Sequence, residues 1–354
     1  MKRNGYIDII KFVFAILIAE FHLNSGLFLG GRLAVEGFFM ITGYFMIGSI
    51  ERDKHPEEKL GVSTVKFMSR KFSSLFPYLF VSTILASIVY TVIRKHTFTQ
   101  WLASVPLLMF DIFPLHNAGF RGEYVCGISW YLSSMFIALA ILYPLCRKFR
   151  DNFILTVCPL ITLLVYGFLS HYYGNIAVGV DFFKETVLNT GVMRALAGIS
   201  LGAILYKICY ALKDKKVTVA GRILFTVAEI LGFTYFFYAM NEHVRSAYDY
   251  VLVFVIFGLL IIGIGGLSFT SYLWNSKWTK PFGTISTLIV LNHYCYAAYL
   301  RSVYGADFVK TEKVWLYIPA VIGACIISFV FGKLIELLMK QIPKIKIFEK
   351  KAED

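Results

Sequence analysis

Residues 7–27 read IDIIKFVFAILIAEFHLNSGL, a mostly apolar run that is long enough to cross a lipid bilayer as a helix. Four ionisable side chains interrupt this run: Asp8, Lys11, Glu20 and His22. A charge at bilayer depth costs several kcal/mol, so such groups usually face a protein interior or a water-filled cavity. The segment is therefore the first candidate for a functional site.

The spacing of these side chains sharpens that interpretation. Lys11 and His22 are separated by about three helical turns, which places them on one face about 16 Å apart along the helix axis. Asp8 precedes Lys11 by almost one turn and is predicted to pair with its ammonium group. The pattern predicts a polar stripe that runs from the water boundary at the N-terminus to a histidine deep in the span.

The composition identifies a membrane protein. The 354 residues are 58% hydrophobic and only 16% charged, and the mean hydropathy is +0.67. Soluble domains are nearer half apolar and a quarter charged. We therefore predict an all-α, polytopic bundle of transmembrane helices, with little room for a separate soluble domain.

The net charge of +13 and the six cysteines exclude several classes of function. Basic residues collect in the cytoplasmic loops of membrane proteins, and no basic stretch interleaved with aromatics points to a nucleic-acid partner. The cysteines are scattered singly, without a C-x-x-C pair or a Cys/His metal spacing. We expect neither a disulfide framework nor a metal site.

We predict ten spans of about 20 residues each. They cover residues 7–27, 33–50, 74–94, 127–146, 153–172, 186–208, 222–241, 249–267, 282–302 and 314–338. The apolar segment 100–117 is interrupted by two prolines and an aspartate, and is predicted to be interfacial or re-entrant. With a cytoplasmic N-terminus, most of the 35 Lys and Arg residues fall inside, which favours both termini in the cytoplasm. Residues 1–339 would form the membrane domain and 340–354 a charged cytoplasmic tail.

A second motif follows the first span. Residues 30–45 read GGRLAVEGFFMITGYF, and Glu36 enters the second span from its outer end. A carboxylate at this depth can orient a histidine and stabilise its protonated form. The glycines of this stretch can instead serve helix packing, because small residues let backbones approach closely.

The Lys11–His22 spacing, followed by Glu36 in VEGFF and by TGY at 42–44, resembles the opening of the membrane acyltransferase-3 family. That family carries an Arg-x10-His first span, then an acidic residue before Phe-Phe and a Ser-Gly-Phe. Further motifs match in order: FMSRKF at 67–72 with Pro77, SWYLS at 129–133, MRA at 193–195 with Gly198 and Gly202, and GTIS at 283–286 with LNH at 291–293. Lys11 and Thr42 depart from the family's arginine and serine.

The resemblance implies an integral membrane enzyme of about ten helices that transfers an acyl group, usually acetyl. The donor would be a cytoplasmic coenzyme A thioester, and the acceptor a hydroxyl of an envelope or exopolysaccharide carbohydrate. The expected location is a bacterial cytoplasmic membrane, with lipids as neighbours. No metal cofactor is expected.

Site roles follow from this hypothesis. His22 would be the general base, since histidine accepts protons near neutral pH, and Glu36 would polarise it. Lys11, Arg70 and Lys71 would bind the anionic donor, acetyl-CoA. For Arg70 and Lys71, anchoring at the cytoplasmic boundary is the alternative explanation.

Three further residues are predicted to shape the acceptor cavity. Arg194 lies within a span, where a buried guanidinium must find a carboxylate, carbonyls or an anionic ligand, and Glu36 is one candidate partner. Trp130 can stack on a sugar or belong to an interfacial belt. His293 can line the site or make structural hydrogen bonds.

A transporter is the alternative function. Buried Lys, Glu, Arg and His also suit a proton-coupled carrier or flippase for a glycolipid or a small anion. Such carriers often contain inverted halves with matching broken helices. No half-to-half match is found in this sequence, which favours the enzyme.

Overall fold

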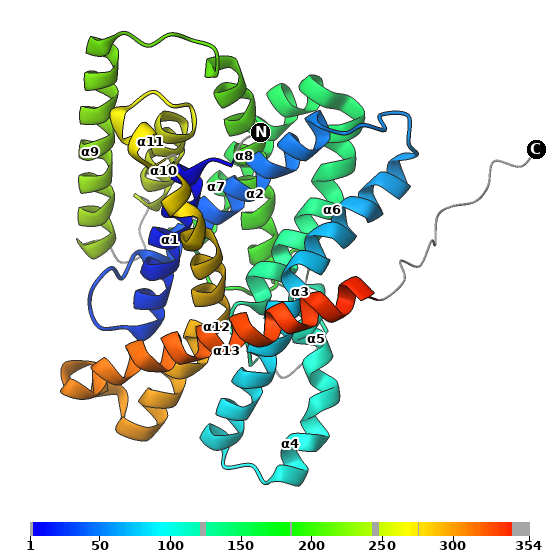
Figure 1. Cartoon of the computed structure of the whole chain (residues 1–354), viewed down its shortest axis with the longest axis vertical. Coiled ribbons are helices and arrows are strands. Elements are labelled where there is room, and N and C mark those ends of the chain that lie inside the picture. Colours follow the sequence, from blue (N-terminus) through cyan, green and yellow to red (C-terminus); the bar gives the residue numbers. More distant parts are fainter. Residues whose placement is uncertain (1–2, 121–124, 185, 243–247, 275, 342–354) are drawn as a thin grey trace, which may run out of the picture.

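The computed structural model describes residues 3–120, 125–184, 186–242, 248–274 and 276–341, and these residues confirm the all-α prediction (Figure 1). In this part of the chain, the only β-type pairing is an isolated bridge between Phe182 and Asn189. Of the predicted tail 340–354, residues 342–354 lie outside the described residues. The helices are α1 (Gly5–Leu23), α2 (Ala34–Glu51), α3 (Leu60–Arg94), α4 (Phe98–Ser104), α5 (Met109–Ile112), α6 (Ser129–Asn152), α7 (Cys158–Tyr173), α8 (Thr190–Leu212), α9 (Val219–Glu242), α10 (Asp249–Ile264), α11 (Phe269–Trp274), α12 (Lys280–Tyr304) and α13 (Tyr317–Gln341).

Each of the ten predicted spans overlaps one of these helices, although several helix ends differ from the predicted bounds. Within the described residues, six helical stretches are long and apolar enough to cross a membrane by length and composition, and α1, α10 and α12 are not among them. One of them, Ser129–Tyr173, contains two predicted spans, because α6 and α7 run into each other through a kink at Arg150 (φ 49°). A helical membrane bundle is thus established, while the count of ten and the cytoplasmic placement of both termini stay predictions.

The segment 100–117 does not form one long helix. It is divided into α4, α5 and short 3-10 turns, and Pro106 lies at the start of one of these turns. The Trp101 indole N–H donates to Ser87 Oγ of α3 over 3.2 Å, which ties the segment back to the bundle. This broken geometry agrees with an interfacial or re-entrant segment.

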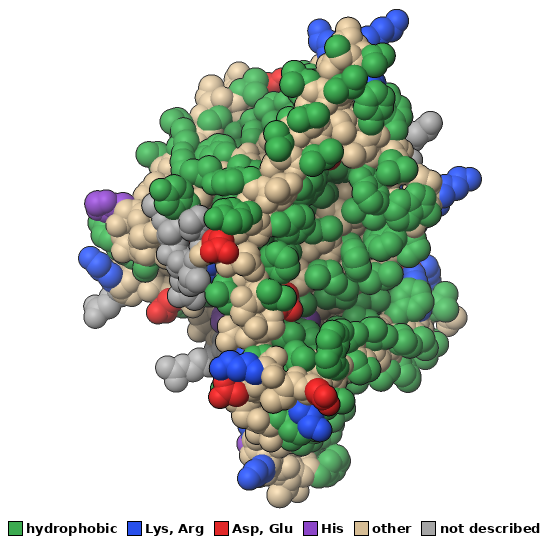
Figure 2. Space-filling view, turned by 90° about the vertical axis from the view of Figure 1, so that its left-hand side faces the viewer, with side chains coloured by type: hydrophobic (Ala, Val, Ile, Leu, Met, Phe, Trp, Pro, Cys, Tyr) green, Lys and Arg blue, Asp and Glu red, His purple; other side chains and the backbone are tan. Residues whose placement is uncertain are grey.

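Helix α2 lies at the centre of the bundle, and α9 stands at its edge (Figure 1). In the most apolar window of each stretch, 89% of the residues are buried in Gly31–Glu51 but only 22% in Val219–Glu242. The exposed outer faces are apolar too. Figure 2 shows hydrophobic side chains over most of one side of the molecule, with Lys and Arg at its margins. Such a surface suits contact with lipid.

Helices α1 and α12 are parallel neighbours. At one end the Arg3 guanidinium donates to the carbonyl of Lys280, and at the other the Arg301 Nη2 donates to the carbonyl of His22 over 3.3 Å. Between these ends, the rings of Phe12 and Phe282 meet edge to face at 4.9 Å. Because α1 and α12 run side by side in the same direction, residues at corresponding positions along the two helices can meet.

Helices α2 and α8 pack at two glycines. A Cβ on Gly43 would collide with the carbonyl oxygen of Ile199, and one on Gly202 with the carbonyl oxygen of Met40. The backbones touch because neither position carries a side chain. The predicted packing role of the glycines near Glu36 is thus observed at Gly43.

Substituting Gly202 by valine is expected to destabilise the bundle by about 1–3 kcal/mol, because overpacking must push α8 away from α2. Thermal unfolding of the detergent-solubilised protein measures this effect. Gly167→Ala on α7 is the matched control, since a Cβ there meets nothing within 4 Å. Equal unfolding temperatures for the two variants would contradict the close backbone packing.

Candidate active site

The structure brings together two histidines from opposite ends of the chain. His22 lies in the last turn of α1 and is half-buried, while His293 lies midway along α12 and is fully buried. Their ring centroids are 5.2 Å apart, with an interplanar angle of 38°. The Tyr294 ring also meets His22, edge to face at 4.9 Å. Two residues predicted from separate motifs therefore form one imidazole pair.

His22 lies nearer a helix end than its sequence position suggests. Helix α1 ends at Leu23 because Asn24 adopts the left-handed conformation, with φ 59° and ψ 45°. Asparagine tolerates this conformation better than most residues, so it is a common helix terminator. The histidine consequently sits where the span meets the following loop, which leaves part of its surface accessible.

The hydrogen bonds of His293 define its tautomer. Its Nδ1 lies 3.0 Å from the carbonyl oxygens of both Ile289 and Val290. Carbonyl oxygens only accept, so Nδ1 must carry the proton, and in the neutral ring Nε2 then holds a lone pair. This Nε2 is buried and has no hydrogen-bond partner among the described residues. In the same part of the chain, the His22 ring likewise makes no hydrogen bond.

Glu36 belongs to a second buried cluster. Its Oε1 accepts from Arg194 Nε at 2.7 Å, and its Oε2 accepts from the Tyr166 hydroxyl at 2.6 Å. Arg194 also donates to the carbonyl of Val178 at 3.0 Å and lies over the Trp130 ring at 5.2 Å. Glu36 is therefore the partner of Arg194 that the sequence suggested.

Two contacts that the sequence suggested, Glu36 with His22 and Asp8 with Lys11, are not formed in the described structure. No hydrogen bond or ion pair joins Glu36 to His22 in the described residues; the partners of the Glu36 carboxylate there are Tyr166 and Arg194. Asp8 pairs with Arg3 at 2.6 Å rather than with Lys11. The guanidinium of Arg3 reaches Asp8 from the N-terminal segment, which spacing along one helix does not anticipate.

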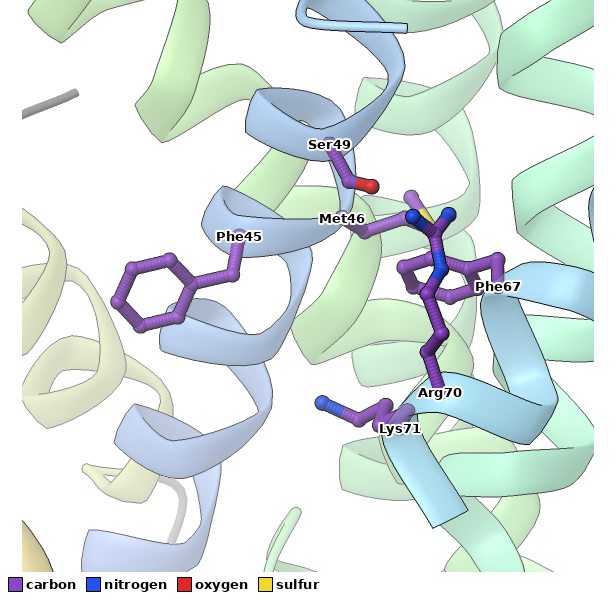
Figure 3. Close-up of a pocket in the computed structure, with 6 residues that line it drawn as sticks. All are labelled: Phe45, Met46, Ser49, Phe67, Arg70 and Lys71. Carbon is purple, nitrogen blue, oxygen red and sulfur yellow. The ribbon is translucent and has the colours of Figure 1, made fainter. Parts of the chain in front are cut away.

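The three predicted donor-binding cations gather at the opposite end of α1 from His22. Arg70 and Lys71 line a cavity of about 290 Å³ between α2 and α3 (Figure 3). In Figure 3, Arg70 extends toward Ser49, and Lys71 points toward α2. Lys11 of α1 lies near Lys71 but is not among the residues that line this cavity. The remaining lining residues are Phe45, Met46, Ser49 and Phe67.

Within the described part of the chain, no carboxylate forms an ion pair with Arg70 or Lys71, whereas Lys11 has Asp8 in its neighbourhood without a direct ion pair. The one side-chain hydrogen bond of Arg70 there runs from Nε to the carbonyl of Lys66, at 3.2 Å. By contrast, Lys66 on the same helix pairs with Glu58. The two like charges of Arg70 and Lys71, which have no carboxylate partner there, favour an anionic ligand.

Comparison with known proteins decides the family. A family model described as an acyltransferase domain matches residues 4–333, nearly the whole chain. The chain belongs to the membrane acyltransferase-3 family. Comparisons with curated proteins and with solved structures found no match. The family assignment makes this protein a membrane acyltransferase, and the match includes both histidines and all three cations.

One residue of the buried Glu36 cluster was not predicted. Tyr166 lies in the apolar run LLVYGF of α7, and its buried hydroxyl completes the coordination of Glu36. A buried tyrosine hydroxyl needs a partner, so a mid-span tyrosine is a usable signal. The identity of its partner depends on how α7 packs against α2 and α8, which the sequence pattern does not specify.

Proposed function

We propose that this protein is an O-acyltransferase of the cell membrane, bacterial in type. It moves an acyl group, most simply acetyl, from cytoplasmic acyl-CoA to a hydroxyl of an envelope or exopolysaccharide carbohydrate. The observation that carries the proposal is the meeting of His22 and His293 in a chain whose family transfers acyl groups. An imidazole with a free ring nitrogen is the group best suited to take a hydroxyl proton near neutral pH.

The donor binds through its phosphates at the pocket lined by Arg70 and Lys71, with Lys11 beside it. Phosphates and guanidinium or ammonium groups make strong charge-assisted hydrogen bonds. Lys11 and His22 stand about three turns apart on α1, about 16 Å. A thioester on the flexible arm of coenzyme A can thus extend from the pocket toward the histidine pair. The acceptor enters from the other side, where α1 ends.

The chemical step is a direct transfer. His22 takes the proton of the acceptor hydroxyl, and the resulting oxygen nucleophile bonds to the thioester carbonyl carbon. The carbon–sulfur bond then breaks, and His22 returns its proton to the departing sulfur, which leaves as the thiol of coenzyme A. Arg194 and Trp130 bind the acceptor, and Glu36 holds Arg194 in place.

Thioester cleavage tests the proposal. Membranes that contain the protein are incubated with acetyl-CoA labelled in its acetyl group and with an extract of envelope polysaccharide. Release of free thiol together with labelled polymer is the expected result. Mass spectrometry of envelope carbohydrates from cells with and without the chain then identifies the acceptor. Uptake or export of a solute without any thiol release would favour the transporter instead.

Neutralising the pocket is expected to weaken donor binding specifically. Arg70→Gln or Lys71→Gln should raise the KM for acetyl-CoA by about ten- to a hundredfold, because each removes a hydrogen bond to a charged group. The turnover number should change little. Lys66→Gln is the control, since it removes the same charge from α3 at a residue already paired with Glu58. If all three variants keep the wild-type KM, the donor binds elsewhere.

A further inference from the structure

The buried imidazole of His293 has one nitrogen that its surroundings leave without a partner. The side chain is 0% exposed, and its Nε2 makes no hydrogen bond among the described residues. An unsatisfied buried polar atom costs about 1–3 kcal/mol, so its presence needs an explanation. The adjacent group is the His22 ring.

The surroundings hold His293 firmly in this orientation. Its Nδ1 is shared between two carbonyl oxygens of its own helix at 3.0 Å. Its carbonyl accepts from the Tyr317 hydroxyl at 3.2 Å. The neighbouring Asn292 accepts from Ser328 Oγ at 3.1 Å, which binds α12 to α13. The free nitrogen of His293 is therefore presented at a fixed place.

The separation of the two rings suits a hydrogen bond. A ring nitrogen lies roughly 1 Å from the ring centre, so an N–H···N bond of ~2.9 Å needs centroids about 5 Å apart. The observed separation is 5.2 Å. The bond itself is not formed in this structure, and it requires the His22 ring to turn from its packing against Phe21 and Tyr294. No hydrogen bond holds that ring within the described chain.

We propose that His293 is the positioning residue of the base His22, in the place where a carboxylate was expected. Its Nε2 accepts a hydrogen bond from one N–H of His22, which fixes the His22 tautomer and turns the other, unprotonated nitrogen toward the acceptor hydroxyl. A base that is held in one tautomer is ready to take a proton, whereas the other tautomer presents an N–H instead. His293 acts through an uncharged nitrogen, so the one positive charge that the step creates is on His22. The assignment rests on the proposed acyl transfer.

Two substitutions separate positioning from packing. His293→Leu keeps an apolar side chain of similar bulk but removes the acceptor atom. His293→Gln retains an acceptor oxygen at the end of a chain of similar length. We expect kcat to fall by about 10- to 100-fold in the leucine variant, with the KM for acetyl-CoA unchanged within about threefold, and the glutamine variant to recover most of kcat. His171→Leu is the control, because His171 is exposed at the end of α7 and has no role in the proposal.

The tautomer of His22 provides a readout that is independent of activity. Histidine-selective nitrogen-isotope spectra of the protein in detergent micelles are recorded, with the His22 signal assigned by its loss in His22→Ala. One neutral tautomer is expected in the wild type and in His293→Gln, and a mixture in His293→Leu. The unfolding temperature of each variant is measured as well. If the leucine variant does not fold, the test rests on the wild type and His293→Gln: both must show a single His22 tautomer, and a mixture of tautomers in the wild type would overturn the positioning role.

The outcomes distinguish this inference from the proposed function. An active wild type with unchanged kcat in His293→Leu overturns the positioning role alone. Equal loss of activity in both variants with one unaltered His22 tautomer also overturns it, since the residue then serves only packing. A wild type that cleaves no thioester refutes the proposed function, while the tautomer spectra still test the contact between the two rings.

Discussion

Replacing His22 by alanine is expected to lower the rate of acyl transfer by a factor of about 10² to 10⁴, the usual contribution of a general base. The imidazole is the one group at the end of α1 that combines partial exposure with a ring free of hydrogen bonds in the described structure. Donor binding should survive, because the cationic pocket lies about three turns away along the helix. The measurements are acetyl transfer to polymer and the KM for acetyl-CoA.

A matched control separates loss of the base from loss of folding. His171→Ala removes an exposed imidazole at the end of α7, far from the histidine pair in sequence and outside the proposed machinery. It should retain full activity. A His22→Ala protein that reaches the membrane, unfolds at the wild-type temperature and still transfers acetyl at the normal rate would remove His22 from the mechanism.

Much of the fold could be predicted because membrane helices obey a simple rule. About 20 apolar residues are needed to cross a bilayer, and each such run forms a helix here. Helix ends are less predictable. Helix α3 begins at Leu60, well before the predicted residue 74, because its first turns carry polar and basic residues that hydropathy assigns to a loop. The polarity of the sequence indicates where a segment leaves the apolar part of the bilayer, but the helix can continue beyond that point.

The candidate site could be predicted only in part, for a related reason. Sequence patterns identify side chains that are costly to bury, and these include both histidines and Arg194. They do not reveal which of these groups meet. Glu36 was expected to serve His22, but it bonds to Arg194 and Tyr166 because α2, α7 and α8 pack together at that level. The pairing of His22 with His293 likewise follows from the parallel packing of α1 and α12.

Breaking the Glu36–Arg194 ion pair is expected to have the largest effect on stability. Both side chains are buried, and their Nε–Oε1 distance is 2.7 Å. Replacing Glu36 by leucine leaves a guanidinium uncompensated in the interior, which costs about 3–5 kcal/mol. Arg194→Met should be similarly destabilising, since it leaves the carboxylate and the Tyr166 hydroxyl together without a cation. Both are measured as unfolding temperature and as yield of folded protein in detergent.

The double variant tests whether the cost arises from the unpaired charge. Glu36→Leu combined with Arg194→Met removes both charges, so it should be more stable than either single variant, as replacing a whole buried ion pair by apolar side chains is often neutral. Breaking the fully exposed pair of Asp307 and Lys310 by Asp307→Asn provides the contrast, because solvent screens those charges and no shift should be detected. Additive losses in the double variant would mean that each side chain stabilises the bundle through its own packing, and that Glu36 does not serve chiefly to hold Arg194.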